Sequence, residues 1–94
     1  MIKSFACRET EKIFNGKKSK ILPNNLHKKA IIKLTMIDAS ENVDDLRIPP
    51  SNRLHKLKGT RKEEYSISIN SKYRICFKWK DNNAYNVEIT NHYC

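Results

Sequence analysis

Glycine, proline and cysteine are scarce in this sequence of 94 residues, which contains two glycines, three prolines and three cysteines. The cysteines are odd in number and widely spaced without a C-x-x-C pair, so we expect reduced thiols rather than a disulfide framework or a zinc site. No apolar run approaches the ~20 residues that span a bilayer, and no stretch resembles the core of a signal peptide. The sequence therefore predicts a cytoplasmic protein that has no membrane partner.

Acidic residues are also few, with ten Asp and Glu against nineteen Lys and Arg, for a formal net charge of +9. This excess predicts a polyanionic partner, with nucleic acid as the first candidate. The length predicts one domain, residues 1–94, near the lower limit for a self-sufficient core. A deep cavity for a large cofactor is not expected, so we predict no cofactor and no metal, and place any chemistry on a surface or in a shallow groove.

The first third of the chain has the pattern of two helices. Residues 2–5 suit a short strand, and Arg8 to Asn15 suit one or two helical turns that Gly16 ends. The basic connector 17–20 is predicted to be a solvated loop, with contact to a phosphate backbone as the alternative. A longer helix is predicted to start at Pro23-Asn24-Asn25, with an Asn as its cap and with His27 exposed. Its core stripe would be Leu26, Ala30, Ile31, Leu34 and Ile37, opposite Lys28, Lys29 and Lys33.

The second half has the alternation of β-strands. Residues 40–50 are predicted to form a linker with one irregular turn, because they contain acidic residues and Pro49-Pro50. Three strands are predicted after it, near 65–69, 73–79 and 85–90. Turns at 70–72 and 81–83 are rich in residues that accept left-handed backbone geometry. One face would carry apolar side chains, Tyr85 included, and the other polar ones. The predicted fold class is α+β: two N-terminal helices packed on one face of a small, mainly antiparallel twisted sheet, with the opposite face open, concave and basic.

A basic stretch from Arg53 to Lys62 surrounds Gly59 and contains no carboxylate. Such a cluster is typical of an anion-binding site, and Lys78 would add to it from the polar face of its strand. Asn91 follows the last strand and could reach the same face. The predicted RNA- or ribosome-binding residues are Arg53, Lys56, Arg61, Lys62, Lys78 and Asn91.

Arg74 is the first candidate for a phosphate-binding residue, because strand parity places it on the polar face and its guanidinium can bind phosphate through two hydrogen bonds. A structural ion pair is the alternative. By parity, Glu88 lies on the same face of the neighbouring strand.

Metal-free RNA cleavage by the neighbouring 2′-hydroxyl needs one group to take its proton, one to protonate the leaving 5′-oxygen, and cations to stabilise the phosphorane. The candidate catalytic residues that supply this set are His55, Lys58, Arg74, His92 and Tyr93. Ordinary surface roles are the alternative for the histidines and the tyrosine, and Tyr93 could instead stack on a base.

The motifs L-x-K-L-K-G-x-R, Y-S-I-S-I and Y-R-I-C-F occur here in the order and spacing found in a known family. With MIKSF at the start and AYNVEIT near the end, the chain resembles the HigB toxins of the RelE superfamily over almost its whole length. The resemblance implies a compact microbial RNase fold, a type II toxin–antitoxin system, and ribosome-dependent cleavage of messenger RNA in the decoding site. It also implies a HigA-like helix-turn-helix antitoxin, through which operator DNA would be contacted only indirectly.

Carried over by position, the family's histidine and lysine fall on His55 and Lys58, and its strand arginine falls on Arg74. The tail departs from the pattern, because many relatives end in Asp-Tyr-His whereas this chain has Asn91, His92 and Tyr93. Whether His55 or His92 is the acid–base group therefore stays open. Two alternatives remain: a ParE-type toxin that poisons topoisomerase, and a non-catalytic basic module that binds RNA or the ribosome.

Overall fold

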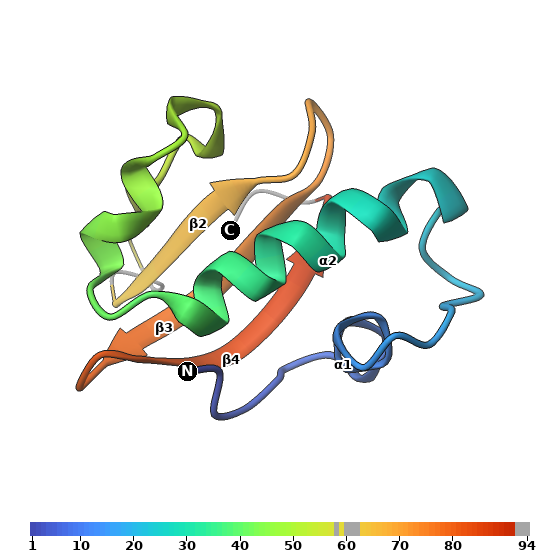
Figure 1. Cartoon of the computed structure of the whole chain (residues 1–94), viewed down its shortest axis with the longest axis horizontal. Coiled ribbons are helices and arrows are strands. Elements are labelled where there is room, and N and C mark those ends of the chain that lie inside the picture. Colours follow the sequence, from blue (N-terminus) through green and yellow to red (C-terminus); the bar gives the residue numbers. More distant parts are fainter. Residues whose placement is uncertain (58, 60–62, 92–94) are drawn as a thin grey trace.

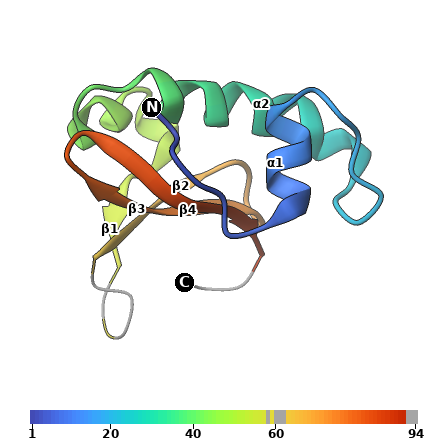
Figure 2. The same cartoon turned by 90° about the horizontal axis from the view of Figure 1, so that it is seen from below.

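The computed structural model describes residues 1–57, 59 and 63–91. In this part of the chain, two α-helices and two short 3-10 helices precede the main part of a four-stranded sheet (Figure 1). The elements are α1 (Arg8–Phe14), α2 (Asn24–Ala39), η1 (Val43–Arg47), η2 (Pro50–Asn52), β1 (His55–Lys56), β2 (Glu64–Ser68), β3 (Arg74–Lys80) and β4 (Asn83–Thr90). The strand order is β1-β2-β3-β4, and each neighbouring pair is antiparallel. Figure 2 shows α1 and α2 on the same side of the sheet, which confirms the predicted fold class.

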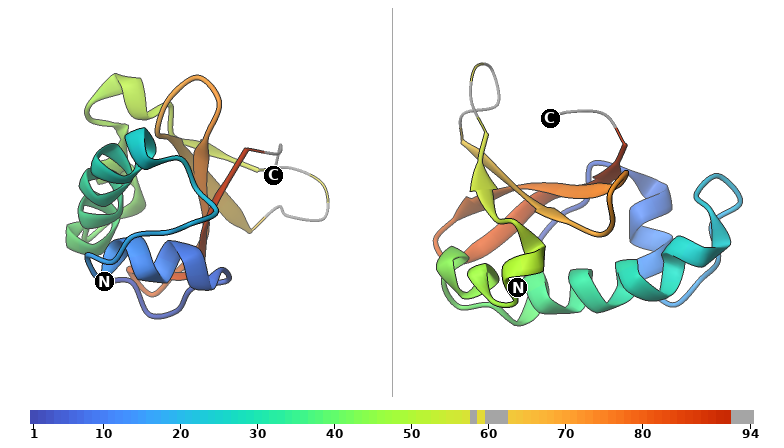
Figure 3. Two further views of the ribbon diagram at one scale, coloured as in Figure 1. Left: turned by 90° about the vertical axis from the view of Figure 1, so that its right-hand side faces the viewer. Right: turned by 90° about the horizontal axis from the view of Figure 1, so that it is seen from above.

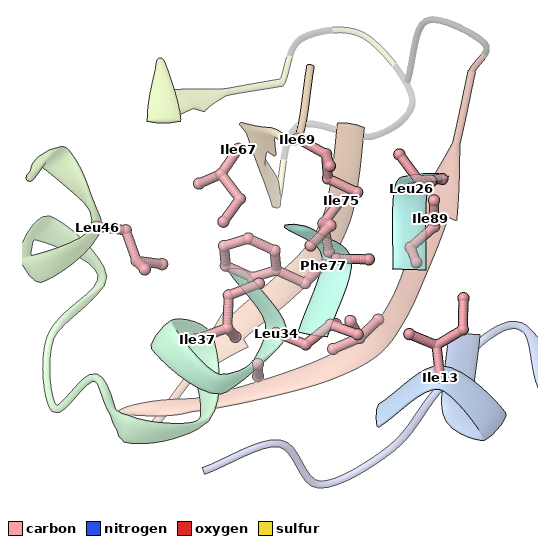
Figure 4. Close-up of a cluster of buried hydrophobic side chains, with 13 residues drawn as sticks. Ile13, Leu26, Leu34, Ile37, Leu46, Ile67, Ile69, Ile75, Phe77 and Ile89 are labelled. Atoms are coloured by element: carbon pink, nitrogen blue, oxygen red, sulfur yellow. The ribbon is translucent and has the colours of Figure 1, made fainter. Parts of the chain in front are cut away.

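The core lies between α2 and the apolar face of the sheet, with further side chains from α1 and η1 (Figure 4). Phe77 is its largest fully buried side chain, and it is flanked by the rings of Tyr65 and Trp79. Leu26, Ala30, Leu34 and Ile37 form the buried stripe of α2 as predicted. Burial of these groups from water is the main source of stability for such a fold.

Two residues of α2 do not lie where the helical spacing predicted. Ile31 is 36% exposed, and Lys33 is half-buried instead of solvated. Each residue of an α-helix is rotated by about 100° around the helix axis from the one before it. On this geometry the side chain of Ile31 points well away from the centre of the buried stripe, whereas that of Lys33 lies at the border of the stripe. Lys33 is accommodated there because its ammonium donates a hydrogen bond to the side-chain oxygen of Asn52, which is 0% exposed.

The start of α2 also differs from the prediction. Pro23 is its N-cap residue, and no side chain caps the helix, because Asn24 is already helical. His27 is half-buried rather than fully exposed, and its Nε2 donates to the carbonyl oxygen of Leu22 at 3.1 Å. An Asn side chain therefore does not set this helix start.

The first hairpin of the sheet confirms the predicted register, and the second confirms the predicted turn chemistry. Ile67 pairs with Ile75, and a backbone bond from Ile69 to Tyr73 closes the first hairpin. In the second, Asp81 and Asn82 have φ values of 52° and 64°, which Asp and Asn tolerate well.

A β-bulge in β4 overturns the predicted parity of Tyr85. The register shifts between Cys76 and Lys78, and Asn86 takes a left-handed φ of 54°. The extra residue moves the alternation by one, so Ala84 is buried and Tyr85 lies opposite Lys78 instead of in the core.

The N-terminal segment, predicted as a short strand at 2–5, makes only two isolated parallel bridges to β4, Ile2 with Ala84 and Phe5 with Val87. Two later segments have more regular structure than predicted. The linker forms η1 and η2, and the part of the basic stretch at His55–Lys56 is a strand, β1, that the sequence pattern did not predict. This strand is an edge strand of the sheet, next to β2 (Figure 3).

The polar face of the sheet is less open than predicted, because Ser66 and Cys76 are both 0% exposed. Cys76 is disulfide-bonded, so the expectation of reduced thiols is wrong for this residue, while Cys7 is a free thiol.

Among the described residues, no helix is long and apolar enough to cross a membrane.

Candidate active site

The pairing of β1 with β2 brings a histidine of the basic stretch to the polar face of the sheet. His55 lies opposite Ser66, and Ser66 lies opposite Cys76 in β3. Arg74 precedes Cys76 by two residues and therefore projects from the same face. Three side chains that are far apart in the sequence thus meet around one point.

Hydrogen bonds hold this cluster of His55, Ser66 and Arg74 together. The Arg74 guanidinium donates to Ser66 Oγ through both Nη2, at 2.8 Å, and Nε, at 3.1 Å. Nη2 of Arg74 also lies 2.9 Å from Nδ1 of His55 and 3.4 Å from the carbonyl oxygen of Arg53. Because Ser66 is fully buried and Arg74 half-buried, these bonds fix the direction of the guanidinium.

The contact between Arg74 and His55 also specifies the role of the imidazole. A guanidinium only donates hydrogen bonds, so Nδ1 of His55 accepts at this distance and the neutral ring carries its proton on Nε2. The imidazole is exposed, and its Nδ1 lone pair points at the same guanidinium that a phosphate would engage. The arrangement places a proton acceptor beside an anion-binding group.

A cleft of about 320 Å³ opens next to the guanidinium of Arg74. Of the predicted binding residues, Arg53 and Asn91 line it together with Arg74, so these predicted site residues are brought together. Its other lining residues are Ser68, Asn70, Ser71 and Lys72. Arg53 adopts a left-handed φ of 48° where η2 ends, and this turn directs the chain into β1.

A second cleft of about 330 Å³ shares Arg53 with the first and extends toward α2, where Lys29 and Lys33 line it. Burial lowers the pKa of Lys33, and the charge of Lys29 lowers it further. The helical lysines were predicted only as a solvated face. Their approach to Arg53 comes from the packing of α2 against η2 and could not be found from helical spacing.

The other predicted site residues divide into two groups. Lys56 and Lys78 are exposed and lie away from Arg74, with the Lys56 ammonium 6.0 Å from the centroid of the Tyr65 ring. The remaining five, Lys58, Arg61, Lys62, His92 and Tyr93, lie outside the described residues.

Sequence reasoning missed Ser66, which is the residue that joins the two catalytic candidates. Strand alternation did place Ser66 on the polar face, but a serine in a strand carries no further signal. Glu88, the proposed structural partner of Arg74, lies opposite Cys76, whereas Thr90 lies opposite Arg74. The two residues are therefore diagonal neighbours across β3 and β4.

Comparison with known proteins identifies the family. Residues 3–92 match the model of the HigB-like toxins, described as RelE-like toxins of type II toxin–antitoxin systems. The chain belongs to the HigB-like toxin family. Toxin HigB-1 of Vibrio cholerae is 37% identical to this HigB-like chain over 78 residues, which cover 83% of the chain and 82% of that protein. An uncharacterized protein of Haemophilus influenzae is 42% identical over 71 residues, covering 76% and 70%.

A solved structure supports the fold of this HigB-like toxin. The YoeB-YefM complex from Staphylococcus aureus contains a chain that matches with a TM-score of 0.63 and 22% identity over 99% of both chains. At this identity the similarity shows the α+β fold alone.

Proposed function

We propose that this HigB-like toxin is a ribosome-dependent endoribonuclease that cleaves messenger RNA in the decoding site. The observation that carries the proposal is the 2.9 Å contact between Nη2 of Arg74 and Nδ1 of His55 on an exposed basic surface. It pairs a phosphate-binding guanidinium with an imidazole that can accept a proton. Membership of a family of RelE-like toxins supports the same reaction class.

In the proposed reaction, a substrate phosphate replaces the imidazole as the hydrogen-bond partner of Nη2 of Arg74. Nδ1 of His55 is then free to take the proton of the 2′-hydroxyl. The 2′-oxygen attacks phosphorus, the bond from phosphorus to the 5′-oxygen breaks, and the leaving oxygen takes up a proton. The products are a 2′,3′-cyclic phosphate and a 5′-hydroxyl.

Ser66 acts in this scheme as a positioning residue. Its hydroxyl accepts from both Nε and Nη2 of Arg74, so the guanidinium does not need to reorganise when negative charge develops on the phosphorane. The remaining candidates from the sequence are Lys58, as a cation for the phosphate, and His92 and Tyr93, from which the second acid–base group would come. Asn91 and Arg53 line the cleft that would take the RNA backbone.

The proposed partners follow from the proposed nuclease activity. The ribosome and its bound messenger RNA are polyanions, which suits the net charge of +9. Because translating ribosomes are in the cytoplasm, the proposed activity is cytoplasmic. A HigA-like helix-turn-helix antitoxin neutralises the toxin, just as the solved relative is a YoeB-YefM complex. Operator DNA is contacted through the antitoxin.

The proposal is tested by primer extension on messenger RNA after expression of the intact chain and of its Arg74→Ala variant. Discrete cuts in register with codons are expected from the intact chain, and they should disappear when translation is blocked. Lys20→Ala, on an exposed residue outside both clefts, serves as a matched basic control and should cut normally. Growth arrest with intact transcripts and damaged DNA would overturn the proposal in favour of a ParE-type topoisomerase poison.

A further inference from the structure

A cleft of about 720 Å³ lies at the end of the sheet opposite Arg74. In Figure 1 this is the end where β2 begins, β3 ends and β4 begins. Three aromatic side chains line the cleft, Tyr65, Trp79 and Tyr85, and each is half-buried. Half-buried rings present an apolar face to solvent while packing holds them in place.

The core holds two of these rings rigidly. Tyr65 stacks on Phe77 with centroids 6.3 Å apart, and Trp79 contacts the same ring edge-on at 6.2 Å. Tyr85 differs, because among the described residues its ring contacts no other aromatic side chain. The bulge at Asn86 is what turns Tyr85 out of the core and into the cleft.

Lysines accompany the rings. Lys56, Lys78 and Lys80 line the cleft, against the two acidic residues Glu63 and Asp81. Lys78 lies directly opposite Tyr85 in the ladder, so a ring and an ammonium share one face of the sheet. Aromatic rings interleaved with cations are the pattern that binds single-stranded nucleic acid, since bases stack on the rings and phosphates meet the cations.

We propose that this cleft is a stacking subsite for a base of single-stranded RNA, with Tyr85 as the stacking ring and Lys78 as the cation beside its phosphate. Lys78 and Arg74 lie on the same face of β3, four residues apart, which is about 13 Å in a β-strand. Roughly two nucleotides of extended single-stranded RNA span this distance. The subsite therefore holds a nucleotide that flanks the scissile phosphate. This inference rests on the proposed function, because it extends the RNA path from Arg74.

Fluorescence of Trp79 can report RNA binding in the cleft, because Trp79 is the single tryptophan of the chain and lines the cleft. The intact protein is titrated with a short 2′-O-methyl RNA, which cannot be cleaved, while Trp79 fluorescence is recorded. Saturable quenching is expected from the single strand. An abasic oligomer of the same charge and a blunt RNA duplex should bind at least ~10-fold more weakly and quench little, because stacking requires an accessible base.

Variants separate stacking from charge. Tyr85→Leu should weaken binding of the single strand ~10-fold, whereas Tyr85→Phe should retain it, since the ring is kept. Tyr73→Leu is the matched control, because Tyr73 is also half-buried and lies near a lysine at the other end of β3. Equal quenching by the abasic oligomer, or equal binding by the Tyr85→Leu and Tyr73→Leu proteins, would overturn the subsite.

The same preparation is assayed for messenger RNA cleavage in a translation reaction, so that the two proposals can fail separately. A protein that cuts but whose Trp79 does not respond to RNA refutes the stacking subsite alone. A protein whose Trp79 responds but which does not cut refutes the nuclease alone. Quenching by an antitoxin, with no response to RNA, would also overturn the subsite and assign the cleft to a protein partner.

Discussion

Nη2 of Arg74 lies 2.9 Å from Nδ1 of His55, although 19 positions separate these residues in the sequence. A permanently charged donor therefore faces the acceptor nitrogen of an exposed imidazole, and the buried hydroxyl of Ser66 fixes the donor from behind. The pair is suited to bind a phosphate and to take a proton next to it.

Removal of the guanidinium should abolish most of the activity. We expect Arg74→Ala to lower the cleavage rate by at least ~10²-fold, or about 2.7 kcal/mol of barrier, while the protein stays folded. Arg74→Lys should rescue only in part, because lysine keeps the charge but lacks the planar fork. The measurement is single-turnover cleavage on programmed ribosomes, together with the melting temperature of each variant.

Glu88→Ala is the matched control for the structural alternative. If Arg74 serves mainly as the partner of Glu88, Glu88→Ala should destabilise the protein as much as Arg74→Ala does, and the double variant should cost little more than either single one. A folded Arg74→Ala protein that still cleaves RNA at nearly the normal rate would show that Arg74 takes no part in the mechanism. Lys58 would then be the candidate that stabilises the phosphate.

The hydroxyl of Ser66 should matter through the orientation of Arg74. We expect Ser66→Ala to lower cleavage about 10-fold and stability by about 1 kcal/mol, because Nε and Nη2 of the half-buried guanidinium lose the Ser66 hydroxyl as an acceptor. Ser40→Ala is the control, since the Ser40 hydroxyl is also on a buried residue and donates a hydrogen bond, to the carbonyl oxygen of Met36, but Ser40 lines neither cleft. Similar losses of cleavage in both variants would mean that Ser66 acts only through packing. The cleavage rate of Ser66→Thr is measured as well, because this variant keeps a hydroxyl at position 66.

Asn52 should be important for stability rather than for cleavage. It is 0% exposed, its side-chain oxygen accepts from Lys33, and its amide donates to the carbonyl oxygen of Leu46 at 3.1 Å. Asn52→Ala leaves both partners without this bond, so we expect a loss of about 2–3 kcal/mol in urea unfolding. Ser51→Ala, at the exposed neighbouring position, should change stability little. Equal stability of the two variants would contradict the role given to Asn52.

Glu9 should link stability to pH. The hydrogen bond from the Ser19 hydroxyl lowers the pKa of Glu9 below its ordinary value of 4.5, and Lys12 lowers it further. A carboxylate with a depressed folded pKa stabilises the protein above its unfolded pKa, and this contribution is lost as pH falls through the folded pKa. We expect Ser19→Ala to return the pKa of Glu9 toward 4.5 and to make unfolding less dependent on pH in the acid range.

Titration of the Glu9 side chain by NMR measures this shift directly. Lys12→Ala should also return the pKa of Glu9 toward 4.5, because it removes a hydrogen bond and a nearby positive charge. An unchanged Glu9 titration in Ser19→Ala would show that the hydroxyl does not hold the carboxylate in solution.

Ribosome association should weaken steeply as salt rises, because each phosphate neutralised by Lys or Arg releases condensed counterions. Lys56→Ala, Arg61→Ala and Lys62→Ala should each lower affinity modestly and reduce the salt dependence, without abolishing cleavage at saturating protein. Sedimentation with ribosomes over a salt series measures both quantities. A complete loss of cleavage in Lys62→Ala, with binding unchanged, would place the catalytic centre elsewhere.

The sequence by itself determined the elements whose signals are local. The buried stripe of α2, the stop at Gly16, the hairpin turns and the pairing of Ile67 with Ile75 all follow from side-chain spacing and backbone preference within a few residues. The motifs around His55 and Arg74 also identified the family. These features were predictable because neighbouring residues alone specify them.

Only the tertiary structure decided how distant segments meet. The β1–β2 pairing places His55 against Ser66, the packing of α2 on η2 brings Lys33 to Asn52, and the bulge at Asn86 turns Tyr85 into a cleft. None of these has a local signal, because each depends on long-range hydrogen bonds and on packing between elements. A one-residue bulge reverses the face of every side chain on one side of it, so parity read from sequence fails there.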